Sequence, residues 1–149
     1  MMTPSDTRFA EPRKRILYGK LERVMKRLEK GDLPMVITEV YVFGSFLRNK
    51  KRPRDLDLLL IYDSDATLKM YEAVDGKGPH WRLSQMGRSP SMLRGCLKSN
   101  AEKSVDISIC PSLEEYTRDL LYPMDVCLRI WTPADRDWRG KLREHFSKE

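Results

Sequence analysis

Residues 36–62 read VITEVYVFGSFLRNKKRPRDLDLLLIY. The stretch holds two apolar runs, 36–43 and 56–62, separated by a polar and basic loop. The first run is rich in Val, Ile, Thr, Tyr and Phe, which is typical of a buried strand, and it stops at Gly44-Ser45. The second run is almost continuously apolar, as in a central strand covered on both faces, and Asp57 is its exception. The stretch therefore predicts two strands of a buried sheet, with a carboxylate that needs an explanation.

The segment before this stretch predicts an amphipathic helix from Pro12 to Lys30, with Gly31 as its stop. Six apolar residues recur at helical spacing, and the opposite face is basic. This face could follow a nucleic-acid backbone or face water, and the lack of an aromatic ladder favours water. The apolar set is Ile16, Leu17, Leu21, Val24, Met25 and Leu28; the basic set is Arg13, Lys14, Lys20, Arg23, Lys26, Arg27 and Lys30.

The segments after this stretch predict an alternation of helices and strands. Over 104–110, Val105, Ile107 and Ile109 alternate with Ser104, Asp106 and Ser108, which is strand patterning with an aspartate on the polar face. The other predicted elements are a helix or irregular turn over 63–75, helices over 89–103 and 112–121, a strand over 125–131, and a basic helix after 132–135. We therefore expect an α/β (α+β) fold in which helices flank a mixed central sheet.

Composition limits the class of protein. A chain of 149 residues with 40% hydrophobic and 34% charged side chains fits one domain, which we place at 12–149 after a flexible arm at 1–11. No stretch approaches the roughly 20 apolar residues of a membrane span, so we expect a soluble, cytoplasmic protein without a membrane partner. The net charge of +6 favours phosphate-bearing partners, or is plain surface solubility. The three cysteines are expected to be reduced and mostly buried, and the two histidines receive no role.

Three aspartates are candidates for one site. Residues two apart in a strand point to the same side, so Asp55 and Asp57 would present their carboxylates together, and a neighbouring strand could bring Asp106 beside them. Clustered carboxylates repel one another and need protons or cations. Mg²⁺ is the natural cation, because it takes oxygen ligands and is held by a few carboxylates together with substrate phosphates. Gly44 and Ser45 complete the pattern, since glycine lets backbone amides approach a phosphate.

These residues resemble the DNA polymerase beta-like nucleotidyltransferases, whose pattern is an apolar strand, Gly-Ser, a short spacer, Asp-x-Asp, and a third Asp on a later strand. The chain is most similar to the minimal, single-domain members, in which Gly-Ser continues with a small residue, Arg and Gly. Arg48 keeps the arginine position, Asn49 stands where glycine is usual, and Arg54 replaces a frequent serine.

The resemblance implies transfer of a nucleoside monophosphate, AMP from ATP, to a hydroxyl on a protein or an RNA. It implies two Mg²⁺ ions, with Mn²⁺ as a substitute, bound by Asp55 and Asp57, and Asp106 as a ligand of the ion nearer the acceptor that helps to deprotonate it. Gly44, Ser45 and Arg48 would hold the nucleotide. Two alternatives stay open: a non-catalytic antitoxin or regulatory partner of a cognate toxin protein, and a small-molecule transferase of the aminoglycoside type.

Overall fold

The computed structural model describes residues 12–31, 33, 35–48, 53–67, 69, 97, 103–118 and 127–147. The predicted arm at 1–11 lies outside these residues, as does nearly all of the predicted helix at 89–103. In chain order, the described elements are α1 (Pro12–Lys30), β1 (Ile37–Phe43), β2 (Leu56–Tyr62), β3 (Val105–Cys110), α5 (Leu113–Arg118), β4 (Cys127–Trp131) and α6 (Trp138–Ser147).

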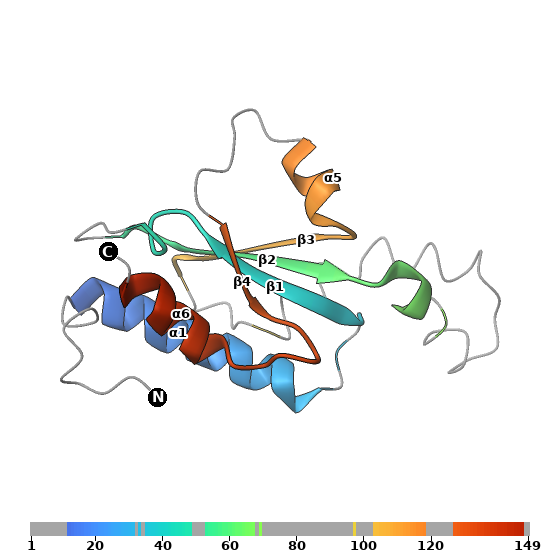
Figure 1. The fold of residues 1–149 in the computed structure, drawn as a ribbon, viewed down its shortest axis with the longest axis horizontal. Coiled ribbons are helices and arrows are strands. Elements are labelled where there is room, and N and C mark those ends of the chain that lie inside the picture. The colour runs from blue at the N-terminus through green and yellow to red at the C-terminus, as the bar shows by residue number, and fades with distance from the viewer. Residues whose placement is uncertain are drawn as a thin grey trace.

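The four strands form one mixed sheet in the order β3-β2-β1-β4. β1 pairs antiparallel with both β2 and β4, whereas β2 and β3 run parallel. Helices α1 and α6 lie side by side on one face of this sheet (Figure 1). The predicted α+β architecture, a mixed sheet flanked by helices, is therefore confirmed.

The apolar runs of the sequence form the core. Leu58, Leu59 and Leu60 in β2 are 0% exposed, as expected of a strand covered on both faces. Leu17 and Leu21 of α1 are also 0% exposed. Burial of these side chains, rather than helix propensity, holds α1 in place.

The two helices meet through aromatic rings. The ring centroids of Tyr18 in α1 and Trp138 in α6 are 5.6 Å apart, and those of Phe46 and Phe146 are 5.8 Å apart in an edge-to-face arrangement. Phe46 belongs to the turn after β1. Helix α6 therefore packs against both α1 and the turn that contains the Gly-Ser pair.

Two side chains of α1 depart from the predicted pattern. Ile16, expected in the core, is 50% exposed, and Lys14, expected on the basic face, is 5% exposed. The reason is α6, which covers an extra strip of α1 and places the Phe146 ring 5.0 Å from the Lys14 ammonium. The ring face attracts the cation, and the aliphatic stem of Lys14 packs like an apolar side chain.

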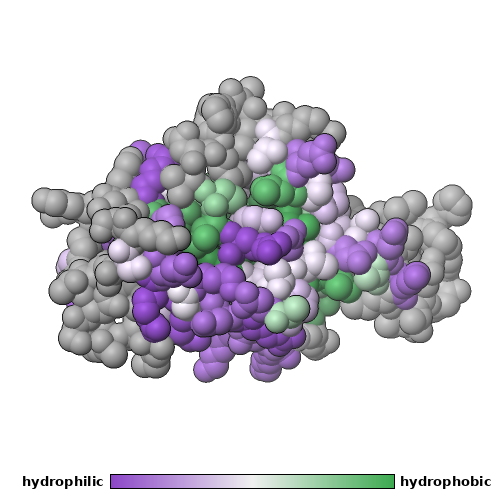
Figure 2. Space-filling model, in the orientation of Figure 1, coloured by the Kyte–Doolittle hydropathy of each residue, from purple (hydrophilic) through white to green (hydrophobic). Residues whose placement is uncertain are grey.

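The cysteine prediction is wrong for Cys127, which is exposed, while Cys110 is partly buried. β4 is an edge strand and Cys127 is its first residue, so a neighbouring strand protects it on one side only. Within the part of the chain that the structure describes, no helix is both long enough and apolar enough to span a membrane. On the face in Figure 2, hydrophilic side chains gather over the region of α1 and α6.

Candidate active site

The candidate site lies at the end of the sheet where β1 finishes and where β2 and β3 begin. Antiparallel pairing places Phe43, the last residue of β1, opposite Asp57. Parallel pairing places Asp106 of β3 directly beside Asp57. We call Asp55, Asp57 and Asp106 the carboxylate site. The register of two strand pairs thus brings together the Gly-Ser turn and two of the three predicted aspartates.

Asp57 carries the electrostatic signature of the carboxylate site. Burial raises the pKa of Asp57 to about 6, and the negative charges of Asp106 and Asp55 and a hydrogen bond with Asp106 act in the same direction. The positive charge of Arg48 works against this increase. Asp57 and Asp106 are therefore a coupled carboxyl pair, with Arg48 close enough to influence it.

Asp55 occupies a less regular position. It precedes β2 by one residue and is partly buried, and its charge contributes to the raised pKa of Asp57. Among the residues that the structure describes, no three His, Cys, Asp or Glu side chains form a group able to hold a metal ion. The arrangement is thus a pair, Asp57 and Asp106, with Asp55 as a neighbour.

The donor chemistry of this pair fits Mg²⁺. All donors are carboxylate oxygens, and Mg²⁺ is usually held by one or two carboxylates plus substrate phosphates rather than by a complete protein cage. A cation between Asp57 and Asp106 would also offset the repulsion that helps to raise the Asp57 pKa.

Gly44 makes room for the Asp57 carboxylate. Its φ of 78° lies in the left-handed region, and a Cβ at this position would collide with Oδ2 of Asp57. Both the backbone conformation and the lack of space require glycine. The turn backbone therefore lies directly against the carboxylate.

The turn after Gly44 is held from three directions. The amides of Leu47 and Arg48 donate to the Gly44 carbonyl at 3.1 and 3.2 Å. The Ser45 hydroxyl accepts the Arg54 amide at 3.0 Å, which ties the turn to the residue before Asp55. Nε2 of His145, in α6, lies 3.0 Å from the Leu47 carbonyl oxygen. Gly44, Ser45 and Arg48 are thus all close to the carboxylate site, whereas Asn49 and the basic residues at 50–52 lie outside the described residues.

Sequence reasoning missed two residues that support this region, Arg13 and His145. Arg13 belongs to the predicted basic face of α1, yet its guanidinium donates to the carbonyls of Pro53 and Arg54 and to the hydroxyl of Ser104. These partners are 40, 41 and 91 residues away along the chain. No local pattern signals contacts over such separations.

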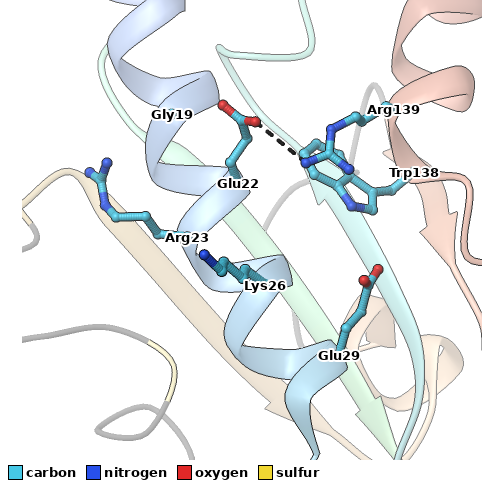
Figure 3. A pocket seen from close by; sticks show the side chains of 7 residues that line it. All are labelled: Gly19, Glu22, Arg23, Lys26, Glu29, Trp138 and Arg139. Atoms are coloured by element: carbon cyan, nitrogen blue, oxygen red, sulfur yellow. Dashed lines mark hydrogen bonds and ion pairs between the residues drawn. The ribbon is translucent and has the colours of Figure 1, made fainter. Parts of the chain in front are cut away.

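A separate hollow lies between α1 and α6 (Figure 3). Its lining includes both signs of charge, with Glu22 and Glu29 on one side of the balance and Arg23, Lys26 and Arg139 on the other. In Figure 3, Glu22 and Arg139 point toward each other. Within it, an Arg139 guanidinium nitrogen pairs with a Glu22 oxygen at 3.4 Å. Its mixed charges already compensate one another in part, and it contains none of the three aspartates.

No curated protein matches the chain in sequence. A search of solved structures finds the crystal structure of a "putative nucleotidyltransferase" from Sulfolobus solfataricus, with 14% identity and a TM-score of 0.47 over 90% of this chain and 95% of that one. Residues 3–145 match a family described as a family of unknown function (DUF6932). The chain therefore belongs to the DUF6932 family.

Proposed function

We propose that this chain is a metal-dependent nucleotidyltransferase that moves a nucleoside monophosphate, AMP from ATP, onto a hydroxyl of a protein or an RNA. One observation carries the proposal: the strand register that sets Asp57 beside Asp106, at the point where Gly44 lies against Asp57. Carboxylates and a glycine turn are the two components that a site for metal-bound triphosphate needs.

Each residue has a defined part in this proposal. Asp57 and Asp106 would hold Mg²⁺ or Mn²⁺ as a pair, and Asp55 would supply a third carboxylate. Gly44 and Ser45 lie against the triphosphate. Arg48, whose charge already acts on Asp57, neutralises phosphate charge.

The reaction is an in-line displacement. The acceptor oxygen forms a bond to the α-phosphorus, the bond from that phosphorus to the bridging oxygen of the β-phosphate breaks, and pyrophosphate leaves with the electron pair. Asp106, the most exposed carboxylate of the site, accepts the proton of the hydroxyl. Bound magnesium supplies charge stabilisation of the attacking and leaving oxygens. Positioning and charge neutralisation, rather than covalent chemistry, provide the rate enhancement.

A transfer assay tests the proposal. Purified chain, Mg²⁺ and each α-labelled nucleoside triphosphate are combined with cell lysate as the acceptor. Label moving to protein or RNA from ATP is expected, and its loss is expected in Asp57→Asn and Asp106→Asn. Asp65→Asn is the matched control, because Asp65 is an exposed carboxylate in the helical segment that follows β2. Undiminished transfer in folded Asp57→Asn would refute the carboxylate assignment.

A second candidate is a nucleotidyltransferase-like binding partner without chemistry, such as the antitoxin of a toxin protein. The two functions differ in their need for metal. Triphosphate binding that depends on Mg²⁺, followed by transfer, supports the enzyme. Binding without metal dependence and without transfer supports the partner.

A small-molecule transferase is the third reading, and it differs in acceptor. Label appearing on aminoglycosides, and on neither protein nor RNA, would identify it in the same assay.

A further inference from the structure

Arg13, in the first turn of α1, reaches three acceptors on two separate segments. Nε donates to the Pro53 carbonyl at 3.2 Å, and Nη2 donates to the Arg54 carbonyl at 2.7 Å and to the Ser104 hydroxyl at 2.8 Å. The guanidinium is partly buried among these groups. Its planar fork suits several acceptors at once, whereas a lysine ammonium is a point charge on a flexible stem.

The two segments lead directly to the carboxylate site. Pro53 and Arg54 come immediately before Asp55, and Ser104 stands two residues before Asp106. The segments are also joined to each other, because the amide of Leu56 donates to the Ser104 carbonyl at 2.7 Å. Arg13 therefore spans the junction at which β2 and β3 start.

Two features of this junction raise the free energy of the folded state. Ser104 has a φ of 65°, a left-handed conformation that costs free energy for any residue with a Cβ and persists only when its surroundings hold it. Parallel pairing also sets Asp57 directly beside Asp106 at this junction, and two adjacent carboxylates repel one another. The carboxylate repulsion favours separation of the starts of β2 and β3, and the Ser104 conformation needs neighbouring groups to hold it.

Helix α1 is well placed to hold the two segments together, because it is anchored in the core. Arg13, Leu17 and Lys20 lie on one strip of the helix, at positions i, i+4 and i+7. Leu17 is 0% exposed, and the Lys20 ammonium donates to the Lys103 carbonyl, next to Ser104. The strip thus holds the turn before β3 at two points.

We propose that Arg13 is a positioning residue that sets the spacing of Asp106 from Asp55 and Asp57. It acts through the backbone carbonyls of Pro53 and Arg54 and through the side-chain hydroxyl of Ser104. The inference rests on the proposed function, because the spacing matters for a cation shared among these carboxylates. Residues that orient metal ligands typically contribute about 10- to 100-fold to metal affinity.

The test uses Arg13→Gln and Arg13→Lys in the full chain, with Arg15→Gln as the control because Arg15 is an exposed arginine on the same turn. Mn²⁺ affinity is measured with the metal alone, from the paramagnetic resonance signal of free Mn²⁺. Amide hydrogen exchange at Leu56 is followed in the same variants, since its amide bridges the two segments. Ser104→Ala removes one acceptor without touching α1.

Both Arg13 variants are expected to bind Mn²⁺ about 10- to 100-fold more weakly and to exchange faster at Leu56, with Arg15→Gln unchanged. Ser104→Ala is expected to show a smaller loss in the same direction. Full Mn²⁺ affinity in Arg13→Lys would mean that charge alone suffices and would overturn the positioning role. If the wild-type chain binds no Mn²⁺, the proposed function fails by itself, and the exchange rates decide: faster exchange at Leu56 supports the positioning role of Arg13, and unchanged exchange overturns it.

Discussion

Replacing Asp57 by Asn should stabilise the protein at pH 8 and leave its stability unchanged at pH 4. In the folded chain, burial and the neighbouring carboxylates raise the pKa of Asp57 from 3.8 to about 6. At a pH between the unfolded pKa of 3.8 and the folded pKa of about 6, the folded state binds more protons than the unfolded state. The free energy of unfolding therefore falls as the pH rises through this range. Above pH 6, Asp57 is ionised in the folded state, and its unfavourable surroundings lower the free energy of unfolding. A neutral Asn at this position does not have this unfavourable charge.

The magnitude follows from the same values. The difference between 3.8 and about 6 corresponds to about 3 kcal/mol, at about 1.4 kcal/mol per pH unit. Because Asp57 is only half-buried, solvent screening reduces this figure, and we expect a gain of about 1 to 2 kcal/mol at pH 8.

The assay is urea unfolding in a metal chelator at pH 4, 5, 6, 7 and 8, with wild type, Asp57→Asn and the exposed control Asp65→Asn. The increase in the free energy of unfolding of Asp57→Asn over wild type should grow between pH 4 and 6 and then level off. Asp65→Asn should show no such increase. A variant no more stable than wild type at pH 8, or a gain equal at pH 4 and 8, would refute the reasoning. A gain of this kind is what a functional carboxylate predicts, because such groups are retained at a cost in stability.

Three further predictions address the residues around the site. Gly44→Ala should lower the free energy of unfolding by more than Gly31→Ala, since both glycines have positive φ (78° and 85°) but only the Gly44 Cβ would meet Asp57; the Gly31 change isolates the backbone cost of about 1–2 kcal/mol in the same urea assay. Asp106→Asn should lower the pKa of Asp57 towards its ordinary value, measured by NMR titration of the side-chain carboxyl carbon, because one of the two neighbouring charges is removed. Thr67→Val should cost about 1–3 kcal/mol, since this 0% exposed hydroxyl accepts one backbone amide at 2.9 Å and donates to one carbonyl at 2.7 Å, and Thr67→Ser should recover most of the loss.

Each of these has an outcome that contradicts it. Equal losses for Gly44→Ala and Gly31→Ala would mean that the Asp57 carboxylate yields freely to an added Cβ. An Asp57 pKa that does not move in Asp106→Asn would mean that the two carboxyls are not coupled. A Thr67→Val variant as stable as wild type would mean that water replaces both hydrogen bonds.

Much of the secondary structure was predictable because it depends on neighbours in the chain. The bounds of α1, Pro12–Lys30, follow from helical spacing and from the glycine stop. The bounds of β2, Leu56–Tyr62, follow from an uninterrupted apolar run. The strand predicted at 104–110 and the helix predicted at 112–121 each begin one residue later, at Val105 and Leu113. The strand predicted at 125–131 is described over Cys127–Trp131, and residues 119–126 lie outside the described residues. Strand and helix ends depend on pairing and packing, which local patterns do not contain.

The candidate site divides in the same way. Residue type and order along the chain are enough to predict one site made of Gly44, Asp55, Asp57 and Asp106. Their actual grouping is uneven: Asp57 and Asp106 pair in register, while Asp55 lies one residue before its strand. Register arises from the fit of whole strands, so a spacing of residues along the chain does not determine it.

The amino-acid sequence by itself determined where the strands and the long helix form, and which oxygen-bearing side chains are available for chemistry, because periodicity and residue type are local properties. Only the tertiary structure decided which side chains meet. Lys14 is buried under Phe146, Arg13 reaches acceptors up to 91 residues away, and Asp57 acquires a pKa of about 6 from strands brought together by pairing. Burial and electrostatics depend on distance through space, and the fold sets that distance.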